Sequence, residues 1–176
     1  MAHPRMYEDS SPAIKRLRTI CLALPAAFEK EAWGECTFRV TGGSMFAMTD
    51  NDHHRSGHVA VWVKAPAMAQ EILVHADPTR FFVPPYVGAK GWVGVRLDGE
   101  VDWAELAEIL KDGYRLSAPT RLRGRVGSAV DEISGVRKTR RSAPISRTTA
   151  ALKTKPIPTA KPRSKKATRV RHHKTG

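Results

Sequence analysis

With 176 residues, 30 Lys and Arg against 17 Asp and Glu, and a net charge of +13 at pH 7, the chain has room for one ordinary domain and a basic appendage. It contains no apolar run near the roughly 20 residues that cross a bilayer, no apolar stretch of a secretory signal near Met1, and only two cysteines, which make neither a disulfide framework nor a zinc site. These absences favour a cytoplasmic protein, with the nucleoid as one location within it.

The first predicted element is a helix that begins at Pro12, with Ser11 as its cap, and ends before Pro25. Its apolar residues recur at spacings of three and four, which makes one stripe that packs on a sheet. The stripe consists of Ile14, Leu17, Cys21 and Leu24. Cys21 is therefore expected to be buried as a small hydrophobe, and residues 1–10 before the helix are interpreted as a flexible N-terminus.

From residue 28 to residue 64 the pattern changes to the period of two that is typical of strands. Alternating segments at 37–41 and 44–48 flank a Gly-Gly pair, which predicts a hairpin with a two-residue turn. In that register Arg39 pairs with Phe46 on one face of the sheet. The opposite face then holds Phe38, Val40, Met45 and Ala47.

After a polar loop at 49–57, a strand is predicted at 58–64, with three valines on one face and Trp62 and Lys64 on the other. A second helix is predicted at about 66–76. Its inward residues are expected to be Met68, Ile72 and Leu73.

A further alternating strand is predicted at 92–97. Asp102 and Glu105 then form a capping-box-like start for the last helix. The buried stripe of that helix is expected to contain Trp103, Leu106, Ile109 or Leu110, and Tyr114. This order of elements predicts an α+β domain with two layers, an antiparallel sheet with helices on one face, over residues 11–118.

Several short motifs, in this order, resemble the MmcQ/YjbR family of small bacterial proteins over about residues 12–118. The motifs are Leu24-Pro25, Trp33-Gly34, Phe38-Arg39-Val40, Met45-Phe46-Ala47, Lys64, Pro84-Pro85-Tyr86, Gly91-Trp92-Val93 and the helix at 106–114. The resemblance implies an α+β fold likened to type III secretion chaperones, and DNA binding through a double-wing arrangement. The basic tail is not part of the common domain of the family.

The tail is the most asymmetric feature of the chain. Residues 119–176 hold 17 Lys and Arg and only two acidic residues, whereas residues 1–118 hold 13 and 15, a net charge of −2. The tail has few large apolar residues and is predicted to be disordered. Its cations can release counterions from phosphates, which gives sequence-independent binding to nucleic acid. The tail residues expected to do so are Arg121, Arg123, Arg125, Arg137, Lys138, Arg140, Arg141, Lys153, Lys155, Lys161, Arg163, Lys165, Lys166, Arg169 and Arg171.

Two other interpretations of the tail remain open. An anionic membrane or another acidic partner is disfavoured, because the tail lacks Trp, Phe and an amphipathic repeat. A solvated tail with no partner is the remaining alternative.

A second candidate surface is the sheet face opposite the valines. It combines cations with aromatic rings, which could hold phosphates while bases stack. Its expected residues are Arg39, Phe46, Trp62, Lys64, Trp92 and Arg96, with Lys90 nearby. The alternatives are that aromatic and cation–π contacts merely stabilise this face, or that a covering segment or a dimer partner buries it.

Catalytic and metal-binding motifs find little support. His53, His54 and His58 lie in or beside a polar loop without the spacing of a metal site, so a solvated loop is favoured. No nucleophile elbow, Walker loop or dinucleotide fingerprint occurs. We therefore expect no enzyme, no metal and no cofactor.

Together these observations predict a bacterial DNA-binding protein that contacts the phosphate backbone non-specifically through its basic tail. The alternative is an α+β domain that binds a small ligand or a protein, with the tail affecting only location or solubility. The oligomeric state, and the choice of DNA over RNA, do not follow from the sequence.

Overall fold

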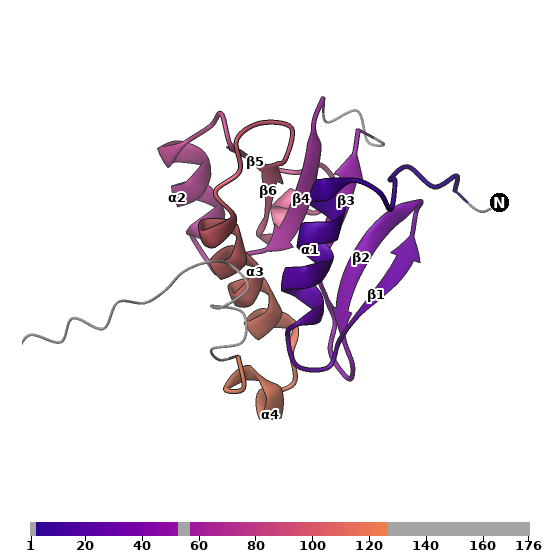
Figure 1. The fold of residues 1–176 in the computed structure, drawn as a ribbon. Helices are drawn as coiled ribbons and strands as arrows, with labels where there is room; N and C mark the ends of the chain where they lie inside the picture. Colours follow the sequence, from indigo (N-terminus) through magenta and orange to yellow (C-terminus); the bar gives the residue numbers. More distant parts are fainter. Residues whose placement is uncertain (1–2, 53–56, 127–176) are drawn as a thin grey trace, which may run out of the picture. The chain divides into compact units, whose positions relative to one another are not determined.

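The computed structural model describes residues 3–52 and 57–126 (Figure 1). A six-stranded antiparallel sheet has the strand order β1-β2-β3-β4-β6-β5. Its strands are β1 (Ala27–Ala32), β2 (Glu35–Val40), β3 (Met45–Asn51), β4 (Val59–Lys64), β5 (Phe81–Phe82) and β6 (Trp92–Arg96). The helices are α1 (Pro12–Leu22), α2 (Ala69–Ala76), the 3-10 turn η1 (Gly88–Lys90), α3 (Trp103–Ser117) and α4 (Thr120–Arg123).

Helices α1 and α3 cover one face of the sheet, the helix face, which confirms the predicted two-layer α+β architecture (Figure 1). The apolar stripe of α1 is buried as predicted, and α3 contacts β3 and β4. The Tyr114 hydroxyl donates to the Pro25 carbonyl oxygen at 2.7 Å, which ties α3 to the chain that follows α1. The core of this face also contains Phe38, Val40, Ala47, Val61, Val63, Val93, Leu106 and Leu110.

The sequence predicted side-chain caps for α1 and α3, and only the cap of α3 forms. The Asp102 carboxylate accepts the backbone N–H groups of Ala104 and Glu105, each at 3.0 Å, which confirms it as the cap of α3. Ser11 precedes α1 but its side chain makes no capping hydrogen bond. Helix α1 begins at Pro12, whose fixed φ suits the first helical position.

The predicted inward residues of α2 are wrong in two of three positions. Met68 is 64% exposed and Ile72 is 62% exposed, whereas Leu73 is half-buried against the core. The reason is placement: this eight-residue helix packs beside β5 and β6 at the sheet edge, so it buries only part of its apolar surface.

The hairpin between β2 and β3 has a three-residue turn rather than the predicted two-residue turn. Gly43 N donates to Val40 O at 2.9 Å, and Val40 N donates to Ser44 O at 3.2 Å. Val40 therefore pairs with Ser44, whereas a two-residue turn would pair it with Met45.

This extra residue produces a bulge in β3. Phe38 pairs with Ala47 as predicted, but Arg39 pairs with Met45 instead of Phe46. A bulge places two consecutive residues opposite one and reverses the expected side-chain alternation. Phe46 is consequently buried in the core on the helix face, so its predicted place beside Arg39 on the opposite face is wrong.

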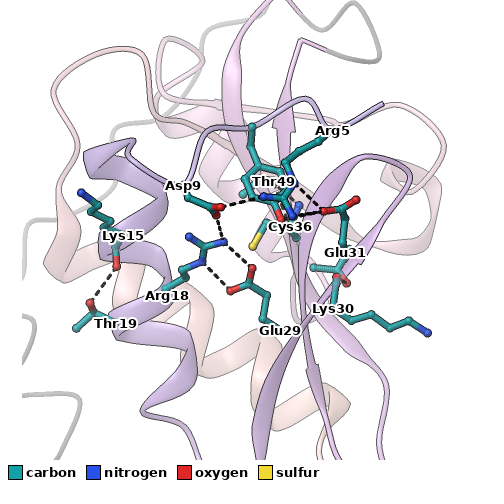
Figure 2. Close-up of polar contacts among 12 residues, drawn as sticks. Arg5, Asp9, Lys15, Arg18, Thr19, Glu29, Lys30, Glu31, Cys36 and Thr49 are labelled. Atoms are coloured by element: carbon teal, nitrogen blue, oxygen red, sulfur yellow. Dashed lines mark hydrogen bonds and ion pairs between the residues drawn. The ribbon is translucent and has the colours of Figure 1, made fainter. Parts of the chain in front are cut away.

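Within residues 3–10, Tyr7 packs on the domain while the other residues are exposed, and the predicted flexibility of the N-terminus stays a prediction. Tyr7 is 5% exposed within the core, and this burial raises its pKa to about 12. Figure 2 shows Arg18 of α1 pointing toward Glu29 of β1 and toward Asp9. The guanidinium lies 2.7 Å from Glu29 and 2.6 Å from Asp9, so one side chain joins α1, β1 and the N-terminal segment.

The Arg18 contact predicts an acid-sensitive contribution to stability. Its hydrogen bonds lower the pKa of both Glu29 and Asp9, so the contribution is complete above their unfolded pKa values and is lost as the pH falls through the lower folded values. We expect Arg18→Gln to reduce the free energy of unfolding by about 1–2 kcal/mol at neutral pH. In urea denaturation, the difference from the parent should shrink below about pH 4, where these carboxylates become protonated.

Arg115→Gln is the matched control, because Arg115 pairs with Asp112 on the exposed surface of α3. It should change stability by less than about 0.5 kcal/mol. Equal losses in the two variants would contradict a special role for Arg18.

Candidate functional site

The face of the sheet opposite the helices, which we call the second face, carries its own buried aromatic cluster. Strand pairing aligns Met48 with Trp62, Trp62 with Gly94, and Gly94 with Phe82 in one row across four strands. The buried members of the cluster are Met48, Ala60, Trp62 and Trp92.

A chain segment covers this face, which is one of the alternatives that the sequence left open. Trp62 is 1% exposed and Trp92 is 7% exposed, so both rings are buried rather than open to solvent. The cover is residues 82–91, in which Phe82 and Val87 pack against the cluster. Gln70 of α2 fixes the cover, because its amide donates to Gly88 O at 2.8 Å and to Trp92 O at 2.5 Å.

The cover leaves an apolar pocket of about 280 Å³ on the second face. Its lining contains no charged side chain and comes from β3, β4, the turn between β1 and β2, and the covering segment. The lining residues are Trp33, Met45, Met48, Trp62, Tyr86 and Val87. A site of this composition suits a flat apolar group in contact with rings and thioethers.

Two of these aromatic residues have a left-handed backbone, which is rare for bulky side chains. Trp33 (φ 55°) and Gly34 (φ 78°) are the central residues of a two-residue turn, the positive-φ pattern of a type I′ hairpin that normally favours Asn-Gly. Tyr86 (φ 62°) is the centre of a three-residue turn in which Val87 N donates to Pro85 O at 2.7 Å. Such conformations cost roughly 1–3 kcal/mol each and are concentrated at functional sites.

Three of the predicted cations gather at one end of the sheet, which we call the basic end. Antiparallel pairing brings the end of β2, the end of β4 and the start of β6 together there. Arg39 and Lys64 lie at the ends of β2 and β4, and Lys90 lies in η1, just before β6 begins. None of them forms an ion pair with a carboxylate within the described ranges.

Residues 119–176, the predicted basic tail, which we call the basic segment, start at the same end of the sheet. Ser44 N, in the turn between β2 and β3, donates to Ser117 O at the end of α3 at 3.1 Å. Leu122 of α4 is buried, while Arg121, Arg123 and Arg125 are exposed. The predicted contacts from residue 137 onward lie outside the described residues, as does the predicted disorder of the tail beyond residue 126.

Arg96 does not belong to this group. It lies at the opposite end of β6, where its guanidinium donates to Thr79 O at 2.6 Å and lies 6.0 Å from the centre of the Phe82 ring. These contacts give Arg96 a structural role in holding β5 and the start of the cover.

Two observations on the described residues concern thiol chemistry and metal binding. Burial raises the pKa of the Cys21 and Cys36 thiols, which disfavours the reactive thiolate. His58 Nδ1 lies 3.1 Å from an Asp98 carboxylate oxygen. In residues 3–52 and 57–126, no three His, Cys, Asp or Glu side chains lie where they could hold a metal, and no helix could span a membrane; His53 and His54 fall outside those ranges.

The pocket residues Trp33 and Tyr86 were not predicted as a site. One local signal was present, namely a Trp directly before Gly between two strand-like segments, where a turn favours Asn. The contribution of Tyr86 depends on residues 82–91 folding back over the sheet, which no local pattern indicates.

Comparison with known proteins matches the chain to a family model and to solved structures. The YjbR family model matches residues 22–116. The crystal structure of Deinococcus radiodurans protein DR2400, described by the family domain DUF419, is similar with a TM-score of 0.51 and 26% sequence identity, over 70% of this chain and 88% of that one. No curated protein matches the chain.

The packing of Phe82 on Gly94 predicts a specific steric effect. A Cβ atom at Gly94 would lie 2.4–2.7 Å from three atoms of the Phe82 ring. We expect Gly94→Ala to displace the ring and lower the free energy of unfolding by about 1–3 kcal/mol in urea denaturation. Gly99→Ala is the control, because a Cβ there meets nothing within 4 Å. Equal stability of the two variants would contradict this packing.

Proposed function

The chain belongs to the YjbR family, and we propose that it is a non-enzymatic DNA-binding protein that holds the phosphate backbone without sequence specificity. The proposal is supported above all by the charge of residues 119–176, which hold 17 Lys and Arg and only two acidic residues. Cations in this number neutralise phosphates and release their counterions, which drives binding to any sequence.

The geometry of the folded domain supports the same function. At the basic end, Arg39, Lys64 and Lys90 lie on the side of the sheet from which α4 and the basic segment continue. A phosphate backbone held by Arg121, Arg123 and Arg125 would therefore lie near further cations of the domain. Phosphate contacts of this kind set position and orientation.

The remaining cations of the domain differ in their surroundings. Arg5, Arg18, Arg80 and Arg115 each pair with a carboxylate, and Arg80 contacts both Asp77 and Glu105. A paired cation contributes little net attraction to a polyanion. Lys15, Arg16 and Lys30, on α1 and β1, also form no ion pair within the described residues. The basic end is distinguished because its unpaired cations lie next to the start of the basic segment, and the near-neutral domain leaves that segment as the main anchor.

The first prediction for this function concerns the basic segment. We expect the full chain to bind a short fluorescent DNA duplex with an affinity that falls steeply with NaCl concentration in fluorescence anisotropy. Replacing eight cations by Gln should reduce the slope of log K against log salt by up to about seven. The eight are Lys153, Lys155, Lys161, Arg163, Lys165, Lys166, Arg169 and Arg171.

The control for this experiment replaces the five lysines of that set by Arg, which keeps the charge. This variant should retain the parent slope, and an unrelated duplex of equal length should give the same values. An unchanged affinity after the Gln substitutions would show that the segment is not the anchor.

The second prediction concerns the basic end. Combined replacement of Arg39, Lys64 and Lys90 by Gln should reduce the salt slope by about two to three, because each removes one phosphate contact. The control replaces Arg5, Arg80 and Arg115 by Gln, an equal loss of charge from carboxylate-paired positions. Equal reductions in both triple variants would indicate a net-charge effect and reject a contact at the basic end.

A further inference from the structure

Phosphate binding gives no role to the apolar pocket of the second face. The lining is aromatic, thioether and aliphatic, and none of its side chains carries a charge. Its floor, Met45, Met48 and Trp62, is set by strand pairing and does not depend on the basic segment. The pocket is therefore a feature of the folded domain alone.

The rim of the pocket is maintained at an energetic cost. Trp33 is 50% exposed and Tyr86 is 77% exposed, so neither ring is positioned mainly to fill the core. Asn or Gly would satisfy both backbone conformations with less strain. Two strained aromatic residues from segments 53 positions apart line the same pocket, which indicates that their rings are kept there for contact with a ligand.

The surroundings of the pocket are electrostatically asymmetric. At the basic end, Arg39 Nη2 lies 3.9 Å from the sulfur of Met45, a pocket residue, and Lys64 lies on the same face of β4. At the other end of β3, the Asp50 carboxylate is buried on this face, and its oxygens accept no hydrogen bond within the described part of the chain. An anionic group on a ligand would therefore be attracted to the Arg39 end.

We propose that this pocket binds a small apolar aromatic molecule that carries one anionic group. The ring lies against Trp33 and Tyr86 over the two methionines, where ring–ring and sulfur–ring contacts stabilise it. The anionic group lies at the guanidinium of Arg39, which can donate charge-assisted hydrogen bonds to it. This binding is independent of the basic segment and goes beyond attachment to phosphates.

A nucleotide also combines a ring with an anion, but the lining disfavours a nucleobase. The edges of a base need several hydrogen-bonding partners, and burying them without partners is costly. The lining supplies only two ring N–H groups and one hydroxyl. An aromatic carboxylate with an apolar ring fits this surface better than a base does.

The test uses calorimetric titration of the full chain with naphthoate, with its uncharged analogue naphthalenemethanol, and with deoxyadenosine monophosphate. Naphthoate should bind most tightly of the three. Trp33→Asn should weaken naphthoate binding by about tenfold, the loss of one stacking contact. Arg39→Gln should weaken it by about tenfold as well, while changing naphthalenemethanol binding by less than about twofold.

Met68→Asn is the matched control. Met68 (φ 67°) is an exposed apolar residue with the same left-handed backbone as Trp33, but it lies outside the pocket lining. Trp33→Asn and Met68→Asn should both keep or raise the melting temperature, since Asn tolerates this conformation. Only Trp33→Asn should lose naphthoate binding.

The variant with eight Gln residues in the basic segment should keep its naphthoate affinity, so failure of DNA binding and failure of this proposal are separable. Three results would overturn the proposal. They are no naphthoate binding by the parent, equal binding by the Trp33→Asn and Met68→Asn variants, or Trp33-dependent binding of the nucleotide that is tighter than that of naphthoate.

Discussion

The contact between the Phe82 ring and Gly94 determines what the second face of this protein can do. Any side chain at position 94 would occupy the space of the ring, because a Cβ there comes within 2.4 Å of it. Glycine normally weakens the interior of a strand, but here it lets the chain turn back over the sheet at β5. From Phe82 the cover continues to Val87 on the tryptophan cluster and carries Tyr86 to the rim of the pocket. One missing side chain thus leaves room for the ring with which the cover of the second face begins.

The parts of the fold that could be predicted are those encoded by local periodicity and capping. The stripe of α1 and the Asp102 cap of α3 each depend on residues within a few positions of one another, and both are confirmed. The side of Phe46 could not be predicted, because one extra residue in the turn before it reverses the alternation in β3. Patterns of period two carry no information about such a bulge.

The candidate site was only partly predictable for a related reason. Arg39 and Lys64 follow from alternation along single strands, and the structure places both on the second face as expected. The burial of Trp62 and Trp92 depends instead on a covering segment with a two-residue strand and one 3-10 turn, which has no periodic signal. Of the two rim residues, only Trp33 carried a sequence signal, the Trp-Gly pair between strands; Tyr86 becomes evident only when its turn is seen.

The two proposed activities share one side chain, and this creates a physical link between them. Arg39 lies both at the basic end and beside the pocket residue Met45. A guanidinium that holds the anionic group of an aromatic ligand is less available to a phosphate of DNA. Bound ligand would therefore weaken the contacts of the basic end while leaving those of residues 119–176 intact. Because linkage is reciprocal, DNA held at Arg39 would lower the affinity of the pocket for its ligand by the same factor. Binding of the small molecule would then lower the affinity of the folded domain for DNA, while the basic segment keeps the protein bound to DNA.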